Sequence, residues 1–526
     1  IFQWDKNGVY ATEGDKIYIS KDNGLSWAEF YTIGDADNIV ISPDGKKVAF
    51  SKAVQVEKLL GKDKYADLPK TTAQIYTDLN HRHWDAWNEG KYNHVFVASI
   101  SDDVSKAKDL LDGQKFDTPQ KPSGGSEDFI WSSDSTKLLY VCKKKSGKEY
   151  ATSTNTDIYT FDLTSGKTEN ITEGMMGYDV NPKFSPDGKS LLWQSMARDG
   201  YEADKNDVVV MDWVSKKKTN LTKNWDESVV GDVAWSNDSK MIYFTTAKRG
   251  TKQFFALNPK DAKVNQISDG AFDVNEIVAF QNDFAFVTRT DINHNADLFK
   301  LNLKDGTMLQ ITQVNKENYA NLTPSKSELK MVKTSDGKEM GVWFHYPPNF
   351  DPNKKYPTLL YCQGGPQSAL TQYFSTRWNF ALMAANGYIV VAPNRRGMPG
   401  WGTKWNEDIS KDWGGQPMRD YIAAADFAKT LPFVDGSRMG AVGASYGGYS
   451  VFMLAGIHEN RFKTFIAHDG LFDMKSWYGT TEELWFANWD LGGNYWQNPQ
   501  PKAYTEFNPS NFVDRWNTPI MVIQGG

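Results

Sequence analysis

Cysteine is scarce in this chain of 526 residues, and long apolar runs are missing from it. Its two cysteines, Cys142 and Cys362, exclude a disulfide framework and a metal site built from several cysteines. Both lie in apolar, strand-like runs, which favours small buried thiols. No uninterrupted apolar run approaches the roughly 18 residues that a membrane-spanning helix needs, so no membrane span is visible.

An excess of one charge is also lacking. The chain has 59 Lys and Arg against 65 Asp and Glu, a formal net charge of −6, and it has no basic tract. This balance argues against nucleic acid as the main partner. Its 42 glycines, 21 prolines and 40% hydrophobic residues exclude collagen-like and disordered chains. At roughly 150 residues per domain, the length of 526 residues corresponds to about three and a half domains, and two large domains fit it equally well.

The sequence does contain a repeated pattern in its first two-thirds. Each copy reads as a strand end, a tight turn rich in Ser, Asp, Gly or Asn, and a second strand. Four clear copies and a weaker fifth are Ile41–Phe50, Trp131–Tyr140, Phe184–Trp193, Trp235–Phe244 and Phe280–Phe286.

The spacing of these copies indicates the architecture. Their aspartates are 90, 53, 51 and 45 residues apart, and a period near 50 with four short strands per unit is typical of a β-propeller. An irregular β-sandwich is the alternative, although sandwiches do not repeat their turn residues at a fixed period. Five to six blades are visible, so we expect seven or eight in the complete ring.

The longest period holds an insertion between Phe50 and His94, inside one blade. Loops between the second and third strands of all blades share one face of a propeller, so we expect this insertion beside the loop Arg198–Asp204. Within the insertion, His81 and His83 have no third ligand type nearby, which favours packing or hydrogen bonding over metal binding. We expect no metal and no organic cofactor.

From about Ser335 the pattern changes to apolar strands that alternate with amphipathic helices, the clearest being Gln416–Leu431. This alternation predicts a mostly parallel, doubly wound sheet. The strand-like runs are Thr358–Cys362, Tyr388–Pro393, Met439–Val442, Thr464–Ala467 and Pro519–Ile523. We therefore predict a β-propeller over residues 1–322, incomplete at its N-terminus, and an α/β-hydrolase domain over residues 323–526, incomplete at its C-terminus.

The candidate chemistry centres on the G-x-S-x-G sequence Gly443–Gly447. The pattern alone is weak, but here a strand runs into it and a helix leaves it, which is the context that exposes a nucleophilic serine. We therefore predict Ser445 as a nucleophile, with a plain glycine-rich turn as the alternative. One oxyanion donor is expected from the Tyr446 N–H, and another from the glycine-containing turn Gln363–Pro366.

The sequence shows no convincing base for this serine. In this fold the order along the chain is Ser, then Asp or Glu, then His. His468 follows Ser445 but precedes the place expected for the acid, after Pro519–Ile523. We therefore expect the Asp and His of the triad beyond Gly526, in a longer protein of which this chain is a part.

A propeller followed by such a hydrolase domain resembles the prolyl oligopeptidase family of serine peptidases, most of all its dipeptidyl-peptidase V and acylaminoacyl-peptidase branch. The segments that carry this resemblance are Tyr76–Trp87, Met196–Asp204, Tyr356–Pro357, Gly364–Pro366, Asn394–Gly397, Gly400–Gly402, Asp412–Gly415 and Gly443–Tyr449.

The resemblance implies a serine exopeptidase that releases dipeptides from the free N-terminus of short peptides, after a small or hydrophobic residue. It implies Ser445 as nucleophile and the N–H groups of Tyr446 and Gly365 as oxyanion donors. It also implies a first specificity pocket with a wall of Leu471, Phe472, Met474 and Trp477. Gln363 departs from the His or Tyr usual in the family, which leaves a side-chain contribution to the oxyanion hole open.

A dipeptidyl peptidase must also hold a free ammonium group, which needs a carboxylate. Glu202 is the candidate, with Asp78, Asp85 and Glu89 as alternatives; a solvated propeller loop is the plainer interpretation. The resemblance further implies a periplasmic or secreted protein with short peptides as partners, and it leaves a homodimer open. Two other functions also stay open: an acylaminoacyl-peptidase or esterase, and a non-catalytic propeller interaction protein.

Overall fold

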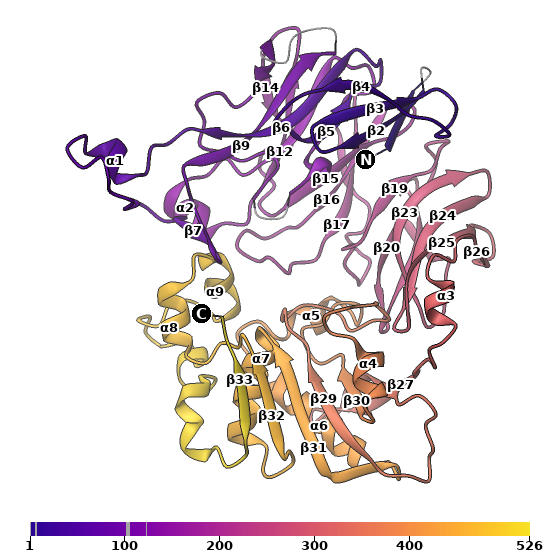
Figure 1. Cartoon of the computed structure of the whole chain (residues 1–526), viewed down its shortest axis with the longest axis vertical. Coiled ribbons are helices and arrows are strands. Elements are labelled where there is room, and N and C mark those ends of the chain that lie inside the picture. Colours follow the sequence, from indigo (N-terminus) through magenta and orange to yellow (C-terminus); the bar gives the residue numbers. More distant parts are fainter. Residues whose placement is uncertain (1, 6–7, 101–105, 122–123, 526) are drawn as a thin grey trace. The chain divides into compact units, whose positions relative to one another are not determined.

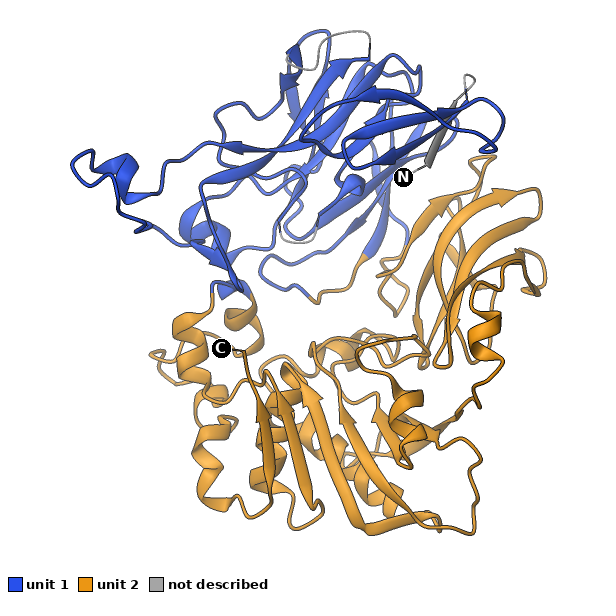
Figure 2. Ribbon diagram, in the orientation of Figure 1, with its two compact units in different colours: residues 1–202, 207–221, 482–485 blue, residues 203–206, 222–481, 486–526 orange. Residues whose placement is uncertain are grey.

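The computed structural model describes residues 2–5, 8–100, 106–121 and 124–525. Contacts divide the chain into two compact units (Figure 2). Unit 1 comprises residues 1–202, 207–221 and 482–485, and unit 2 comprises residues 203–206, 222–481 and 486–526. Figure 1 labels the helices and strands.

Unit 1 contains four antiparallel sheets of four strands each. In the order of strand pairing they are β1 (Phe2–Asp5), β2 (Gly8–Glu13), β3 (Lys16–Ser20) and β4 (Ala28–Thr32); β10 (Lys108–Asp109), β9 (Lys91–Ser99), β6 (Lys47–Gln55) and β5 (Asp37–Ile41); β11 (Phe129–Trp131), β12 (Lys137–Cys142), β13 (Asp157–Asp162) and β14 (Thr168–Asn170); and β15 (Asp179–Phe184), β16 (Ser190–Ser195), β17 (Asp207–Asp212) and β18 (Lys218–Asn220).

The repeated sequence pattern forms the turn between the first two strands of a sheet. In the copy Phe184–Trp193, the Ser185 hydroxyl donates to Asp187 (2.7 Å) and accepts from the Ser190 N–H (3.0 Å). Ser42, Ser132 and Ser236 make the same pair of bonds in their own copies. The serine and aspartate of each repeat therefore close the turn through their side chains.

The predicted insertion lies between β6 and β9, which pair with each other. It contains α1 (Gly61–Lys64) and a small ribbon of β7 (Arg82–His83) and β8 (Ala86–Trp87). Loops at the corresponding position of the next two sheets hold α2 (Gly147–Thr152) and residues 196–206. A short 3₁₀ helix, η2 (Ser126–Asp128), precedes β11.

Unit 2 begins with two more four-stranded antiparallel sheets. They are β19 (Val233–Trp235), β20 (Ile242–Lys248), β21 (Thr251–Asn258) and β22 (Lys263–Gln266); and β23 (Asp273–Gln281), β24 (Phe284–Asp291), β25 (His294–Asn302) and β26 (Met308–Gln310). Six such meanders are the architecture of propeller blades, rather than the two packed sheets of a sandwich.

A seven-stranded sheet completes unit 2 (Figure 1). Its pairing order is β27 (Lys326–Lys333), β28 (Glu339–Tyr346), β30 (Ile389–Pro393), β29 (Tyr356–Cys362), β31 (Val434–Ala444), β32 (Thr464–His468) and β33 (Ile520–Ile523). The five strands from β30 to β33 in this order are parallel to one another. β28 pairs antiparallel with β30 on one side and with β27 on the other. The predicted mostly parallel sheet is confirmed, and β30 has the continuous burial that two covered faces require.

Short connections and helices join these strands. They are α3 (Lys316–Tyr319), α4 (Phe380–Ala385), α5 (Thr403–Glu407), α6 (Gln416–Lys429), α7 (Tyr446–Ile457), α8 (Met474–Thr480), α9 (Leu484–Asp490) and the 3₁₀ helices η3 (Lys502–Tyr504) and η4 (Pro509–Arg515). The predicted domain boundary at residues 322/323 falls between α3 and β27. Unit 2 also contains the last two blades, so the division into compact units does not follow this boundary. The boundary stays a prediction.

Both cysteines are buried free thiols, as their apolar runs predict. In the part of the chain that the structure describes, no helix is long and apolar enough to cross a membrane.

Candidate active site

Ser445 sits in the turn from β31 into α7, as the sequence predicts. Its backbone has φ 57° and ψ −123°, a strained combination for a residue with a side chain. Ser445 is exposed, whereas Gly443 and Tyr446 on either side are buried. The strain therefore accompanies a geometry that presents one hydroxyl above the sheet.

The glycines of this turn permit a close approach to β29. A Cβ atom at Gly447 would lie 2.0 Å from the carbonyl oxygen of Cys362, the last residue of β29. A Cβ atom at Gly443 would lie 2.6 Å from the same oxygen. Neither position admits a side chain, so these two glycines allow the turn to pack directly against the end of the neighbouring strand.

The turn that follows β29 lies beside the serine. A Cβ atom built at Gly364 would be 3.5 Å from the Ser445 Cβ, so Gly364 lies directly beside the serine. Gly365 is exposed and has φ 120°, a conformation that favours glycine. The Gln363 side chain donates to Ser368 Oγ (3.1 Å). The structure thus brings together Ser445 and the two segments predicted to supply oxyanion donors.

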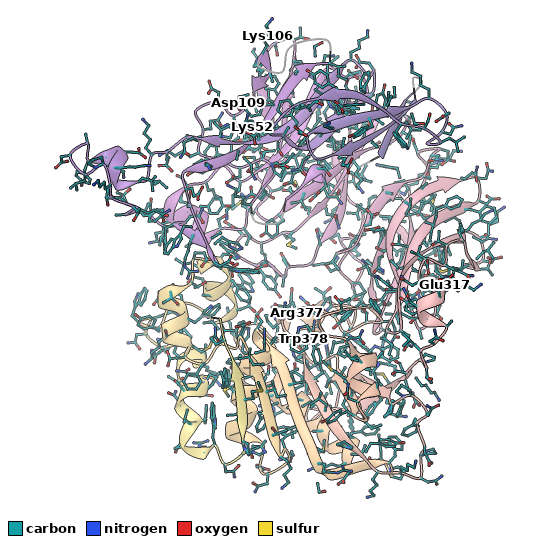
Figure 3. All side chains as sticks on the ribbon, in the orientation of Figure 1. Lys52, Lys106, Asp109, Glu317, Arg377 and Trp378 are labelled. Carbon is teal, nitrogen blue, oxygen red and sulfur yellow. The ribbon has the colours of Figure 1, made fainter. Side chains whose placement is uncertain are left out.

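His468 contacts the serine through its backbone. Its carbonyl accepts a hydrogen bond from the Ser445 N–H (3.0 Å), and its ring packs edge-on to Trp378 at 6.0 Å (labelled in Figure 3). The end of β33 runs parallel to β32, and the carboxyl ends of parallel strands lie on the same edge of a sheet. A triad acid and histidine beyond Gly526 stay a prediction.

The four residues predicted to form the specificity wall differ in their exposure to solvent. Phe472 is 40% exposed, Leu471 and Trp477 are half-buried, and Met474 is fully buried. Trp477 stacks on Trp413 at 5.9 Å, and Trp413 in turn meets the Tyr446 ring edge-on at 4.9 Å. An aromatic series therefore links one member of the wall to the residue after the nucleophile; the wall's role stays a prediction.

Unit 1 holds a separate acidic cluster around Glu202. The Trp485 indole donates to Glu202 at 3.4 Å. Glu202 keeps access to solvent, yet burial among protein atoms raises its pKa. Burial, followed by repulsion from Glu202 and Glu482, raises the pKa of Glu483 to about 7. Carboxylates gathered in this way form an environment suited to a cation.

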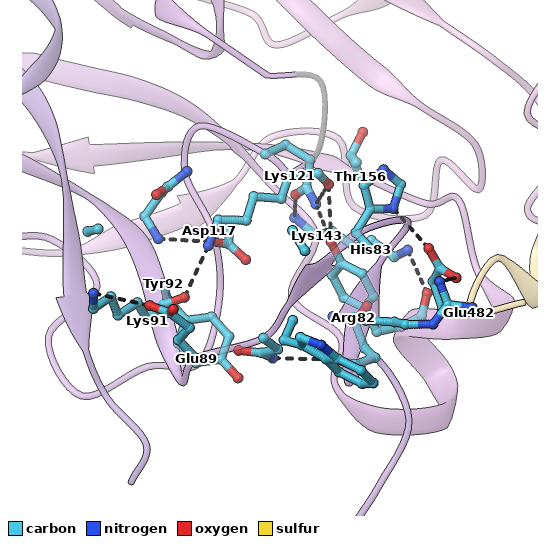
Figure 4. Close-up of a pocket in the computed structure, with 18 of the residues that line it drawn as sticks. Arg82, His83, Glu89, Lys91, Tyr92, Asp117, Lys121, Lys143, Thr156 and Glu482 are labelled. Atoms are coloured by element: carbon cyan, nitrogen blue, oxygen red, sulfur yellow. Dashed lines mark hydrogen bonds and ion pairs between the residues drawn. The ribbon is translucent and has the colours of Figure 1, made fainter. Parts of the chain in front are cut away.

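Glu482 is the buried member of the cluster. It forms an ion pair with Arg82 at 3.3 Å, lies 3.3 Å from His83 Nδ1 (Figure 4), and accepts from the Trp84 backbone N–H at 2.6 Å. Ligand atoms of His83, Glu482 and Glu483 lie within 4.8 Å of one another. The hydrogen-bonding role predicted for His83 agrees with these contacts. His81 packs against Tyr76 and Trp87, with ring centroids 5.7 and 6.0 Å apart.

A cavity of about 600 Å³ adjoins this cluster (Figure 4). It is lined by the insertion, by the loop that contains α2 and by Glu482 and Trp485. At its wall, Lys143 donates to the Tyr150 carbonyl (2.7 Å) and lies 4.8 Å from the Trp485 ring. Burial lowers the pKa of Lys143 to about 7. The lining also includes Glu89, one of the alternative carboxylates, which pairs with Lys91 at 3.2 Å.

Sequence reasoning missed Glu482, Glu483 and Lys143. Glu482 comes from a segment some 400 positions away from Arg82 and His83, and no local pattern connects residues that far apart. The adjacent pair Glu482-Glu483 was the one feature of the sequence that could have indicated the acidic cluster. Two adjacent glutamates are equally typical of the solvent-exposed start of a helix.

The pattern of the prolyl oligopeptidase family matches residues 373–526, and that of the TolB beta propeller domain matches residues 129–342. A Porphyromonas gingivalis protein named dipeptidyl-peptidase 5 is 47% identical over 495 residues, covering 94% of this chain and 72% of that protein. A protein of the same name from Porphyromonas endodontalis is 44% identical, covering 94% and 71%.

Solved structures share the fold. An uncomplexed acylaminoacyl peptidase of Pyrococcus horikoshii matches with a TM-score of 0.77 at 18% identity, over 98% of this chain and 76% of that one. Dipeptidyl peptidase 4 of Porphyromonas gingivalis matches with a TM-score of 0.63 at 16% identity, over 100% and 74%. At such identities the likeness concerns the fold alone.

Proposed function

The chain belongs to the prolyl oligopeptidase family, and on that premise we propose that it is a serine dipeptidyl peptidase. It releases dipeptides from the free N-terminus of short peptides after a small or hydrophobic residue. The observation that carries this proposal is the exposed, strained Ser445, which lies beside Gly364 of the glycine-containing turn.

The reaction is a two-step acyl transfer. Ser445 Oγ attacks the scissile carbonyl carbon and gives its proton to the triad imidazole, which an aspartate orients; both are expected beyond Gly526. The N–H groups of Tyr446 and Gly365 stabilise the oxyanion. Collapse of the tetrahedral intermediate expels the amine, which takes the proton from the imidazole. Water then hydrolyses the acyl-enzyme and releases the dipeptide.

We assign the substrate's ammonium group to Glu202. In support, the raised pKa values of Glu202 and Glu483 indicate carboxylates whose ionised forms are short of stabilisation, which a ligand cation would supply. Glu202→Gln is expected to raise KM for a free-amine dipeptide substrate about tenfold or more, the value of a charged hydrogen bond. Glu173→Gln, at an exposed position of the same unit, should leave KM unchanged.

The remaining features complete the proposal. Leu471, Phe472, Met474 and Trp477 form the wall for the side chain before the scissile bond, and their apolar character suits a small or hydrophobic residue. The complete ring has seven or eight blades. The protein is periplasmic or secreted, where short peptides are available as substrates.

The test compares the full-length protein with Ser445→Ala on two matched chromogenic substrates, a free-amine dipeptide and its N-acylated form. Cleavage of the free-amine substrate alone, lost in the variant, is the expected result. Preference for the acylated substrate would instead assign the chain to the acylaminoacyl-peptidases, the activity named for its structural neighbours. Activity on neither would favour a non-catalytic interaction protein.

A further inference from the structure

A buried arginine lies behind the turn that faces Ser445. Arg395 follows β30, and its side chain is 0% exposed. In the part of the chain that the structure describes, no carboxylate forms an ion pair with Arg395. Its guanidinium donates to Arg396 O (2.8 Å), Pro366 O (2.9 Å), Tyr421 Oη (3.0 Å) and Gln363 O (3.1 Å).

The next residue offers a direct contrast. Arg396 is also buried, but it pairs with Asp336 at 2.8 Å and Asp420 at 3.3 Å. A buried cation is ordinarily balanced by a carboxylate, because desolvation of its charge is costly. Arg395 is balanced instead by carbonyl oxygens and aromatic rings, so its position indicates a role other than ion pairing.

Two of the carbonyls that Arg395 binds bracket the oxyanion turn. Gln363 and Pro366 are the residues immediately before and after Gly364-Gly365. A planar guanidinium fork that holds both carbonyls fixes both ends of this flexible glycine pair.

The same guanidinium also contacts the other half of the oxyanion hole. Its central carbon lies 4.5 Å from the ring centroid of Tyr446, the residue whose backbone N–H is the second predicted donor. The Tyr446 hydroxyl is itself fixed by the Trp413 carbonyl at 2.8 Å. One rigid, buried group thus touches both segments from which the donors come.

We propose that Arg395 is a positioning residue for the oxyanion hole. It holds the Gln363–Pro366 turn in register with Tyr446, so that donors from both segments converge on the same oxygen in the transition state. This inference rests on the proposed function, since it takes Ser445 to be the nucleophile. It explains how the hole is held in a chain whose Gln363 side chain is bonded to Ser368.

The test measures how fast Ser445 reacts with a fluorophosphonate, which requires oxyanion stabilisation but no particular peptide. It uses the full-length protein and Arg395→Lys, which keeps the charge but loses the fork. We expect the second-order labelling rate and kcat for the free-amine dipeptide to fall about 10²-fold, the effect of losing one oxyanion donor, with KM within about twofold. Tyr421→Phe, which removes one of the four bonds, should lower the labelling rate severalfold, and its Tm should fall because the buried Arg395 Nε–H loses its acceptor.

Arg396→Lys is the matched control. It weakens a buried ion pair, so its Tm should fall while the labelling rate stays near that of the wild type. The proposal is overturned if Arg395→Lys labels at the wild-type rate, or if labelling rate and Tm fall in the same proportion in both lysine variants. If Arg395→Lys does not fold, an unchanged labelling rate in Tyr421→Phe overturns it. A wild-type protein that is not labelled at all would overturn the proposed function as well.

Discussion

At the scale of single residues, Ser445 combines an unfavourable backbone conformation with an exposed side chain. Strain of this kind costs about 1–3 kcal/mol and persists only where the surroundings enforce it. Here the Ser445 N–H is bonded to the His468 carbonyl, and the Ser445 carbonyl accepts from the Tyr449 N–H at 2.9 Å. Both ends of the strained residue are therefore fixed by the neighbouring strand and helix.

Because of this strain, we expect two substitutions of Ser445 to lose activity equally but to differ in stability. Ser445→Ala and Ser445→Gly should both lose kcat, by about 10⁶-fold on the precedent of removing such a nucleophile. Glycine adopts this backbone conformation without penalty, so the Gly variant should be more stable than the Ala variant by about 1 kcal/mol. Thermal unfolding of the two variants checks this; equal Tm values would show that the turn is not strained.

The acidic cluster predicts a pH dependence of substrate binding. The pKa of Glu483 is raised to about 7 by burial and by its neighbours Glu202 and Glu482. Above this pH the carboxylate is charged and attracts an ammonium group; as the pH falls through 7 it is neutralised and that attraction is lost. The groups around it are Arg82, His83, Trp84, Glu202 and Glu482.

We therefore expect KM for a free-amine dipeptide substrate to rise severalfold as the pH falls from 8 to 6. Initial rates measured at each pH for the wild type and for Glu483→Gln separate this effect from titration of the catalytic base, which the two proteins share. Parallel KM profiles for the two proteins would remove the cluster from ammonium binding.

At the scale of elements, the contact between β29 and the turn into α7 is what aligns the site. It depends on Gly447, whose missing side chain leaves room for the Cys362 carbonyl. This contact could be predicted from the sequence, because it requires glycines at a fixed spacing between a strand and a helix. The repeated blade turns were visible for the same reason, since each Ser and Asp pair closes its turn locally.

Gly447→Ala should therefore disrupt the joint. Its Cβ would lie 2.0 Å from a backbone oxygen, so the backbone would have to move to relieve the clash. We expect this movement to lower the free energy of unfolding by about 3 kcal/mol and to abolish most of the activity. Gly479→Ala in α8 is the matched control, because nothing lies within 4 Å of its added Cβ. Denaturant unfolding of both variants decides the point, and equal midpoints would refute this role of Gly447.

At the scale of the whole molecule, unit 2 joins the last blade to the hydrolase sheet through buried hydrogen bonds. Asp273, at the start of β23, accepts from the Thr371 hydroxyl (2.5 Å) and from the backbone N–H groups of Gln372 (3.1 Å) and Lys252 (2.8 Å). Thr371 and Gln372 follow the oxyanion turn in sequence. Blade and catalytic sheet are therefore joined within one compact unit.

Asp273→Ala leaves three donors without their acceptor, two of them buried, so we expect unit 2 to lose about 1–3 kcal/mol or more of stability. Asp283→Ala in the same blade removes only an exposed pairing with Lys304 and should change little. Calorimetry of the two variants tests this, and a similar Tm for both would argue that the blade contributes nothing to the stability of the catalytic sheet.

The sequence could not predict the contacts that join distant segments. Arg395 acts on backbone carbonyls, which every residue type provides, so nothing in the sequence marks its partners. The acidic cluster unites residues from positions 82–84, 202 and 482–483, and their proximity depends on how the blades and inserted loops pack. Blade turns and the serine turn were predictable because their chemistry is local.

The central claim is that Ser445 releases dipeptides from free N-termini. Mass spectrometry of the products from one defined peptide, unmodified or N-acetylated and treated with full-length wild type or Ser445→Ala, tests it most directly. We predict successive dipeptides from the unmodified peptide with the wild type, and none from the acetylated peptide or with the variant. Single acetylated residues, internal fragments or dipeptides released by Ser445→Ala would contradict the account.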